Sequence, residues 1–255
     1  MQSNIRNSKK KKLVGRAIIG SGALAIAACA SLDAAFAPSP EQLQAGALSA
    51  WAGLKQAEPI STNPAYISRM ERVAPKIIRA AGGNPSEWEV QVFQSDQLNA
   101  FALPGGKIGF YTGILDLMEN DDQIAAVMGH EVAHVLLEHS AQRAGRSNQL
   151  AVLGGAVSVA AGQTANPQAW MQIYGLGAQV GSALPFSRSH ETEADKKGLR
   201  YMVAAGYNPN EAVRFWERMG AQNNGAPPEF LSTHPASDTR INDLKEEIAV
   251  ISAGS

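Results

Sequence analysis

The segment 124–139 most constrains how this chain can fold, because it places three histidines and two glutamates in an otherwise apolar run. Its spacing predicts a helix that is buried on most of its surface. Asn120 or Asp121 can cap the start of this helix, with Gln123 at the third helical position if Asn120 is the cap. Histidines are costly to bury without partners, so this helix indicates a site with its own chemistry.

Residues 130–134 read His-Glu-Val-Ala-His, which is the motif HExxH. Residues four apart share one face of a helix, so His130 and His134 can bind the same metal ion. Glu131 lies next to that face, where its carboxylate can take a proton from a metal-bound water and return it to a leaving amine. Zinc lowers the pKa of its bound water to about 7. The motif therefore predicts one Zn²⁺ per chain, with Glu131 as the base.

A catalytic zinc needs a third protein ligand, and a second expected helix, from about residue 187 to 205, offers one. Glu191 and Asp195 are four residues apart on that helix, so they share a face. Glu191 can bind the zinc, while Asp195 can accept the outer N–H of a ligand histidine. Gly198 continues the same face and would let the two helices approach each other closely.

Two further histidines are weaker candidates for the third ligand. His139 lies five residues after His134, about 140° round a continuous helix. We therefore expect His139 to face elsewhere, as a helix-end histidine or one that lies behind a ligand. His190 lies off the face that carries Glu191, and Glu193 reads as part of a solvated acidic face.

The remaining segments alternate between helical spacing and short strand-like runs, with a Gly-rich turn at 104–106 between two strands. This pattern predicts an α+β fold that is mainly helical, with a small sheet beside the HExxH helix. Helices are expected over about 42–55, 65–81, 150–162 and 187–205, from 209 onward and around 241–251, and strands over 88–93, 99–102 and 107–112.

The N-terminus has the features of a targeting signal, because a basic cluster precedes a short apolar run. Six of the first sixteen residues are Lys or Arg, and the run 17–28 is too short to span a bilayer comfortably. Residues 26–29 resemble a bacterial lipobox, which predicts lipidation of Cys29. Ordinary cleavage after Ala37 and an uncleaved anchor are the alternatives. All three place the body outside the cytoplasm, and lipidation would tether it to the outer membrane on the periplasmic side.

The body of the chain is acidic, although the formal net charge of the whole chain is −1. Removing the six N-terminal positive charges leaves 16 basic and 23 acidic side chains, a net charge of −7. This balance argues against nucleic acid as a partner. The chain has 1 cysteine, so a disulfide scaffold and a cysteine-ligated metal are excluded.

Several motifs besides HExxH accompany these candidates, and the combination resembles one family. They are 129–134, 187–195, 99–102, 111–113, and 231–235 with Arg240-Ile241. Over about residues 65–250 the chain resembles the bacterial HtpX-like and CaaX-protease-like zinc metallopeptidases, peptidase family M48. The resemblance implies a gluzincin-type zincin fold, with His130, His134 and Glu191 on zinc and Glu131 as base.

The N-terminal signal, a proline-containing stretch and the extent of the resemblance together predict three parts of the chain. Residues 1–37 are expected to be the signal and the start of a linker. Residues 38–64 are expected to continue that linker, with one helix in it. Residues 65–255 are expected to form the zinc metallopeptidase domain.

Three more features are assigned roles with alternatives. The resemblance implies that His234, which precedes a proline, lies near the zinc and gates it or stabilises the oxyanion; the alternative is a capping histidine in a rigid turn. Arg240 either stabilises the oxyanion or pairs with an acid in the core. Residues 107–110 (Lys107, Ile108, Gly109 and Phe110) would bind an extended substrate peptide if their strand lies at the sheet edge, and otherwise form a core strand.

The expected function is that of a zinc endopeptidase of the bacterial cell envelope, acting on unfolded or misassembled envelope proteins. The ligand set combined with the export signal leads to this expectation. The alternative is an envelope chaperone or assembly factor for outer-membrane proteins, with a gated or rarely used protease site. The expected partners are these proteins and, through a lipid on Cys29, the membrane.

Overall fold

The computed structural model describes residues 37–153, 170–171, 174, 185–222, 229–235 and 239–254. The expected export segment with Cys29 lies outside the described residues, and so does the expected apolar helix beyond Leu153. None of the helices in the described part of the chain combines the length and the apolar character that a membrane crossing requires.

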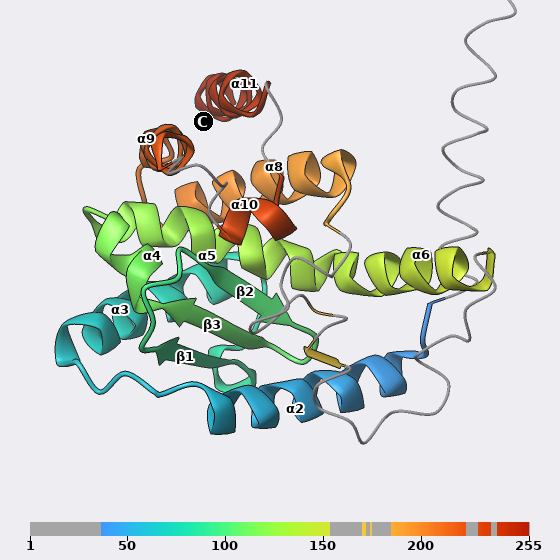
Figure 1. The fold of residues 1–255 in the computed structure, drawn as a ribbon. Helices are drawn as coiled ribbons and strands as arrows, with labels where there is room; N and C mark the ends of the chain where they lie inside the picture. The colour runs from blue at the N-terminus through green and yellow to red at the C-terminus, as the bar shows by residue number, and fades with distance from the viewer. Residues whose placement is uncertain are drawn as a thin grey trace, which may run out of the picture.

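Helices make up most of the described structure, and one three-stranded sheet lies among them (Figure 1). The sequence-based fold class, α+β and mainly helical with a small sheet beside the HExxH helix, is confirmed. The helices are α2 (Pro40–Ala57), α3 (Pro64–Ala80), α4 (Thr112–Leu117), α5 (Asp121–Leu136), α6 (His139–Leu153), α8 (Arg188–Ala204), α9 (Asn210–Ala221), α10 (Glu229–Thr233) and α11 (Arg240–Ala253), with the 3₁₀ turn η1 (Pro85–Glu87). The strands are β1 (Glu89–Phe93), β2 (Ala100–Leu103) and β3 (Lys107–Tyr111).

The sheet has the order β1-β3-β2, with β1 parallel and β2 antiparallel to β3. The turn between β2 and β3 contains Gly105 and Gly106 at φ angles of 79° and 70°, which favour glycine. β3 is therefore the central strand, and its backbone groups pair on both sides. Residues 107–110 do not meet the condition for binding a peptide by strand addition, because their pairing edges are already used by β1 and β2.

Two apolar cores lie on the two faces of the sheet. The larger one joins α3, α5, α8 and α9 to the face that carries Ile108 and Phe110. On the opposite face, α2 packs Trp51 and Leu54 against aromatic side chains of the strands. In Figure 1, α2 runs below the sheet and α5 above it. The segment 38–64, which we expected to be a linker with one helix, thus contributes a packed helix to the folded body; the domain boundary at residue 65 stays a prediction.

The helices α5 and α8 approach each other at two glycines. A Cβ on Gly129 would lie 2.9 Å from the carbonyl oxygen of Gly198, and a Cβ on Gly198 would lie 2.9 Å from the backbone nitrogen of His130. Both contacts are with backbone, which cannot rotate away. The expectation that Gly198 permits close helix packing is confirmed, and this packing brings the acidic face of α8 against the HExxH face of α5.

Candidate metal centre

Three segments that are far apart in sequence supply the side chains of the site. The helix α5 presents His130, Glu131 and His134, and α8, capped by the side chain of Ser187, presents Glu191. His234 directly follows α10, with its backbone N–H bonded to the carbonyl of residue 230 at 2.8 Å. The site is thus assembled by packing of α5 and α8 and closed by a segment about 100 residues from HExxH.

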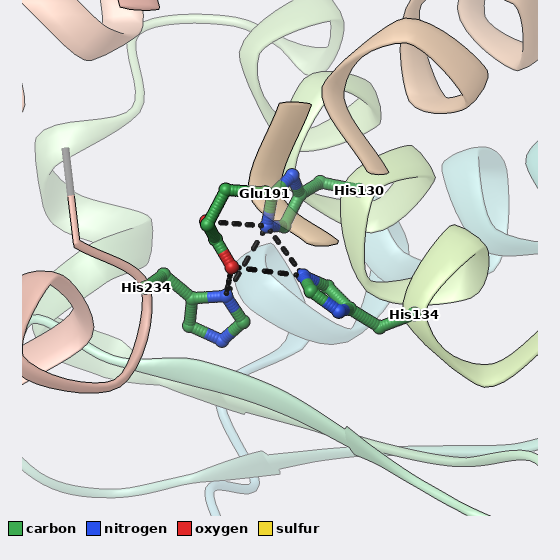
Figure 2. Close-up of side chains that lie close together, drawn as sticks. All are labelled: His130, His134, Glu191 and His234. Atoms are coloured by element: carbon green, nitrogen blue, oxygen red, sulfur yellow. Dashed lines mark hydrogen bonds and ion pairs between the residues drawn. The ribbon is translucent and has the colours of Figure 1, made fainter. Parts of the chain in front are cut away.

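The side chains of His130, His134, Glu191 and His234 converge on one point (Figure 2). Their ligand atoms all lie within 4.8 Å of one another, and all four residues are buried. The Nε2 atoms of His130 and His134 are 3.0 Å apart, and each lies 3.3–3.4 Å from a Glu191 carboxylate oxygen. The Nδ1 atom of His234 lies 3.2 Å from His130 Nε2 and 3.1 Å from Glu191 Oε1.

These separations fit a tetrahedral metal site. Bonds of about 2.0–2.1 Å to imidazole nitrogen and carboxylate oxygen place neighbouring ligands about 3.3 Å apart in a tetrahedron. Five separations of 3.0–3.4 Å, which involve both oxygens of Glu191, are close to that spacing, and the whole set of ligand atoms lies within 4.8 Å. Three imidazoles and one carboxylate are also donors for which a borderline metal such as Zn²⁺ is well suited, whereas Mg²⁺ and Ca²⁺ favour oxygen alone.

The outer nitrogen of His130 is held by charged groups. Its Nδ1 atom lies 2.9 Å from Asp195 Oδ1, as we expected for a carboxylate that orients a ligand. Arg240 donates to Asp195 at 2.7 Å and to Glu191 at 3.3 Å. Its guanidinium also lies 3.4 Å from the ring centroid of Trp216. Arg240 thus pairs with buried acids, which is the second of its two expected roles, while its role at an oxyanion stays a prediction.

The outer nitrogen of His134 is held by a second histidine instead. The Nδ1 atoms of His134 and His139 are 3.0 Å apart. The ring of His139 stacks on that of His190, with centroids 4.4 Å apart and planes at 13°. His190 in turn donates from Nε2 to Gln142 Oε1 at 2.9 Å. On the other side, Phe186 packs on the His134 ring with centroids 4.1 Å apart.

His139 is not among the converging ligand atoms and lies behind His134, which is one of the two positions expected for it. The orientation assumed for its ring is wrong, because the helix breaks before it. We assumed that one helix runs to residue 139, but α5 ends at Leu136 and His139 begins α6. Between them, Glu138 takes a φ of 55°, in the left-handed region that terminates helices. The 140° offset therefore does not apply, and the His139 ring turns back onto His134. Leu137 and Glu138 are neither Gly, Asn nor Pro, so no residue type marks the break.

The ionisation of these groups follows from burial and charge. Burial raises the pKa of Glu131 and lowers the pKa of His134 well below its usual range. Burial alone would lower the pKa of His130, but the carboxylates of Glu191 and Asp195 raise it to about 9. Burial alone would raise the pKa of Glu191, but His234 and His130 hold it well below its usual range. The lowered pKa values favour an ionised Glu191 and a neutral His134, as the candidate ligand roles of these two residues require.

His234 lies between the ligand cluster and Glu131. Its ring stacks on Phe230, with centroids 4.5 Å apart and planes at 14°. Its Nε2 atom lies 3.5 Å from Glu131 Oε1, while its Nδ1 atom belongs to the ligand cluster. His234 therefore lies near the candidate metal centre, as the resemblance implied. Its side chain faces the ligand cluster and Glu131 and not a helix end.

The fold and this cluster are those of a metalloprotease. A family model described as Peptidase family M48 matches residues 63–248. The chain belongs to this family.

The curated relatives have two kinds of name. The chain is 36% identical over 183 residues to the "Mitochondrial metalloendopeptidase OMA1" of Schizosaccharomyces pombe, covering 71% of this chain and 52% of that protein. It is 35% identical over 195 residues to the protein of that name from Saccharomyces cerevisiae, covering 70% and 54%. It is 27% identical over 200 residues to the "Beta-barrel assembly-enhancing protease" of Escherichia coli K12, covering 75% and 41%. The chain spans about half the length of the yeast relatives that it matches.

Proposed function

We propose that this protein is a zinc-dependent endopeptidase that hydrolyses unfolded or misassembled proteins of the bacterial cell envelope. The observation that carries the proposal is the buried group of His130, His134, Glu191 and His234 at tetrahedral spacing, with Glu131 beside it. When bound there, Zn²⁺ would polarise a peptide carbonyl and lower the pKa of a water molecule to about 7.

Glu131 acts as the base in this proposal. Its Oε1 atom has no hydrogen-bond partner among the described residues, so it is available to a water molecule. Burial raises its pKa, which favours both taking a proton from water and returning it to the leaving amine at neutral pH. His234, with Nε2 3.5 Å from Glu131, is placed to stabilise the oxyanion when its Nδ1 leaves the ligand cluster.

The substrate would lie along β2, and not along β3 as first expected. Within the described structure β2 pairs only with β3, which leaves its other edge for a peptide. That edge faces the site, because a backbone hydrogen bond from Ala102 reaches the Glu131 carboxyl. A cavity of about 810 Å³ opens beside His134, bounded by the start of α2, the β2–β3 turn and the α5–α6 junction. An extended, unfolded chain fits such an edge because strand addition reads little sequence.

Zinc content and a single substitution test this function. The purified protein should contain one Zn²⁺ per chain, and Glu131→Gln should slow casein hydrolysis by at least about 10²-fold while keeping the zinc. The matched control is Glu217→Gln, which changes an exposed carboxylate on α9 and should leave hydrolysis intact. Absence of stoichiometric zinc, or a Glu131→Gln variant as fast as the wild type, would contradict the proposal.

The envelope location is supported by the sequence and by one group of relatives. The basic cluster, the apolar run and the lipobox ending in Cys29 favour export and lipid attachment, which would tether the protein to the outer membrane on its periplasmic side. The relative from Escherichia coli is named for β-barrel assembly, whereas the yeast relatives are named as mitochondrial. In a bacterial host, a lipid mass shift that is absent in Cys29→Ala would support the tether, and an unmodified full-length chain would contradict it.

A gated site is a second possibility, and His234 favours it. With its Nδ1 among the ligands, all four tetrahedral positions are filled by protein, whereas a catalytic zinc keeps one open. If His234 is a gate, His234→Ala should raise casein hydrolysis sharply. If it does not, and Glu131→Gln still binds unfolded outer-membrane proteins, the chaperone or assembly role is favoured.

A further inference from the structure

The contact between His134 and His139 fixes where the protons of both rings must be. Their Nδ1 atoms are 3.0 Å apart, and both rings are 1% exposed, so one atom donates to the other without water. If His139 donated, the proton of neutral His134 would sit on Nε2, the atom that faces His130 and Glu191. That tautomer cannot bind a metal through Nε2. The metal-binding tautomer requires His134 to donate and His139 to accept.

The surroundings of His139 favour its acceptor role. When Nδ1 accepts, the single proton of the neutral ring sits on Nε2, and this atom lies 3.5 Å from the carboxylate of Glu193. The His139 ring also stacks on His190, which donates to Gln142, but in the described part of the chain neither of these two residues contacts a candidate ligand. The backbone turn at Glu138 supplies the direction from which the ring approaches.

We propose that His139 is a positioning residue for the metal centre: it accepts the Nδ1 proton of His134 and thereby presents the His134 Nε2 lone pair to the metal. The inference rests on the proposed zinc site. In this arrangement an imidazole accepts the outer N–H of a metal-binding histidine, which is usually accepted by a carboxylate or a backbone carbonyl. Glu193, which reads as a solvated acid in the sequence, becomes the outer end of this chain of contacts.

Zinc affinity of three variants tests the proposal, measured by competition with a chromogenic chelator. His139→Ala removes the acceptor and should weaken Zn²⁺ binding by about 10–100-fold. His139→Asn places an acceptor oxygen near the position of Nδ1 and should bind within about threefold of the wild type. His190→Ala removes the stacked ring but no contact with a ligand, and should also stay within about threefold.

The outcomes separate this inference from the proposed function. A wild-type protein without stoichiometric zinc would remove the proposed site itself. If the wild type binds zinc, equal affinity of His139→Ala and the wild type would overturn the positioning role. So would a His139→Asn variant as weak as His139→Ala, or an equal loss in His190→Ala, since packing would then explain the effect. If His139→Ala folds poorly, the His139→Asn variant still tests the proposal. The unfolding of each variant is measured in the same buffer with excess chelator, so that a loss of stability can be told apart from a loss of zinc affinity.

Discussion

His130 and His134 lie one turn apart on α5, yet the protein holds their outer nitrogens in opposite ways. Behind His130 are an acid and a buried arginine, Asp195 and Arg240. Behind His134 are two further imidazole rings, first His139 and then His190. The difference follows from which element packs there: α8 brings charge to one side, and the α5–α6 turn brings an imidazole to the other. One ligand is thus anchored electrostatically and the other by tautomer and packing.

Removing the guanidinium of Arg240 should have the largest effect, because this group compensates the acids behind His130, which we call the charged side of the site. Arg240→Met would leave Glu191 and Asp195 buried without the arginine that pairs with both, which should lower the free energy of unfolding by about 3–5 kcal/mol. Urea unfolding in the presence of a chelator measures this loss. Excess Zn²⁺ should reduce it, since the metal also compensates the Glu191 charge.

The matched control lies on the same helix. Lys245 pairs with Glu217 at 3.4 Å, and both side chains are more than half exposed. Lys245→Met should change the free energy of unfolding by less than about 1 kcal/mol. If both variants lose similar amounts of unfolding free energy, Arg240 contributes no more to stability than an exposed lysine does.

A larger side chain between α5 and α8 should push the two helices apart and so move the acids of α8 away from His130. Gly198→Ala puts a methyl group 2.9 Å from the backbone nitrogen of His130, so α8 must shift, at an expected cost of about 1–3 kcal/mol. Thermal unfolding measures the stability, and zinc binding should weaken with it because α8 carries Glu191. Gly220→Ala on α9 meets no atom within 4 Å and should be neutral or slightly stabilising. If both alanines behave alike, the close approach of α5 and α8 is not what holds Glu191 in place.

Substitution by asparagine behind each of the two histidines, at Asp195 and at His139, compares the two kinds of support directly. Asp195→Asn keeps an acceptor oxygen behind His130 but removes its charge, and should weaken zinc binding by about 10–100-fold. His139→Asn also leaves an acceptor, replaces a neutral group by a neutral group, and should bind zinc almost as the wild type does. The chelator competition assay gives both constants. Equal constants would mean that charge behind His130 is irrelevant to the metal.

The smallest effect is expected at an ion pair outside the site, which serves as a pH reference. Burial alone would raise the pKa of Glu89, but Lys55 and Lys107 outweigh it and lower the pKa to about 2 from its usual 4.5. The folded state therefore gains stability above pH 4.5 and loses it as the pH falls towards 2. Glu89→Gln should lower stability at pH 7 by less than about 1 kcal/mol, because the pair is partly exposed.

Acid titration with and without Zn²⁺ checks this reference. The difference between Glu89→Gln and the wild type should shrink to nothing by about pH 2, and zinc should not alter it. A difference that grows in acid, or that depends on zinc, would show that this pair is coupled to the metal centre.

The helices whose signals are local were predicted well from the sequence. The helix expected from 187 to 205 is α8, Arg188–Ala204, because the Ser187 cap and the apolar spacing act within one turn. The helix expected at 42–55 is α2, Pro40–Ala57, and begins two residues earlier because Ser39 and Gln42 form a capping box. These features need no distant partner, so a single sequence carries them.

What could not be predicted depends on contacts between distant segments. The strands around 99–102 and 107–112 were expected, but not that β1 would pair in parallel on the far side and make β3 central. The helix break at Glu138 carries no marker residue, since a left-handed backbone at a non-glycine position is held by its surroundings. The orientation of the His139 ring toward His134 therefore could not be inferred from spacing.

By itself, the sequence determined the chemistry: HExxH spacing puts two imidazoles on one helical face, and the i, i+4 pair on the second helix supplies Glu191 and Asp195. The tertiary structure decided how that chemistry is supported. Arg240 became the partner of acids, and His139 turned back onto His134, because helix packing and one left-handed residue set their directions. Spacing within a helix is fixed by local geometry, whereas the partner of a side chain is fixed by which segments pack together.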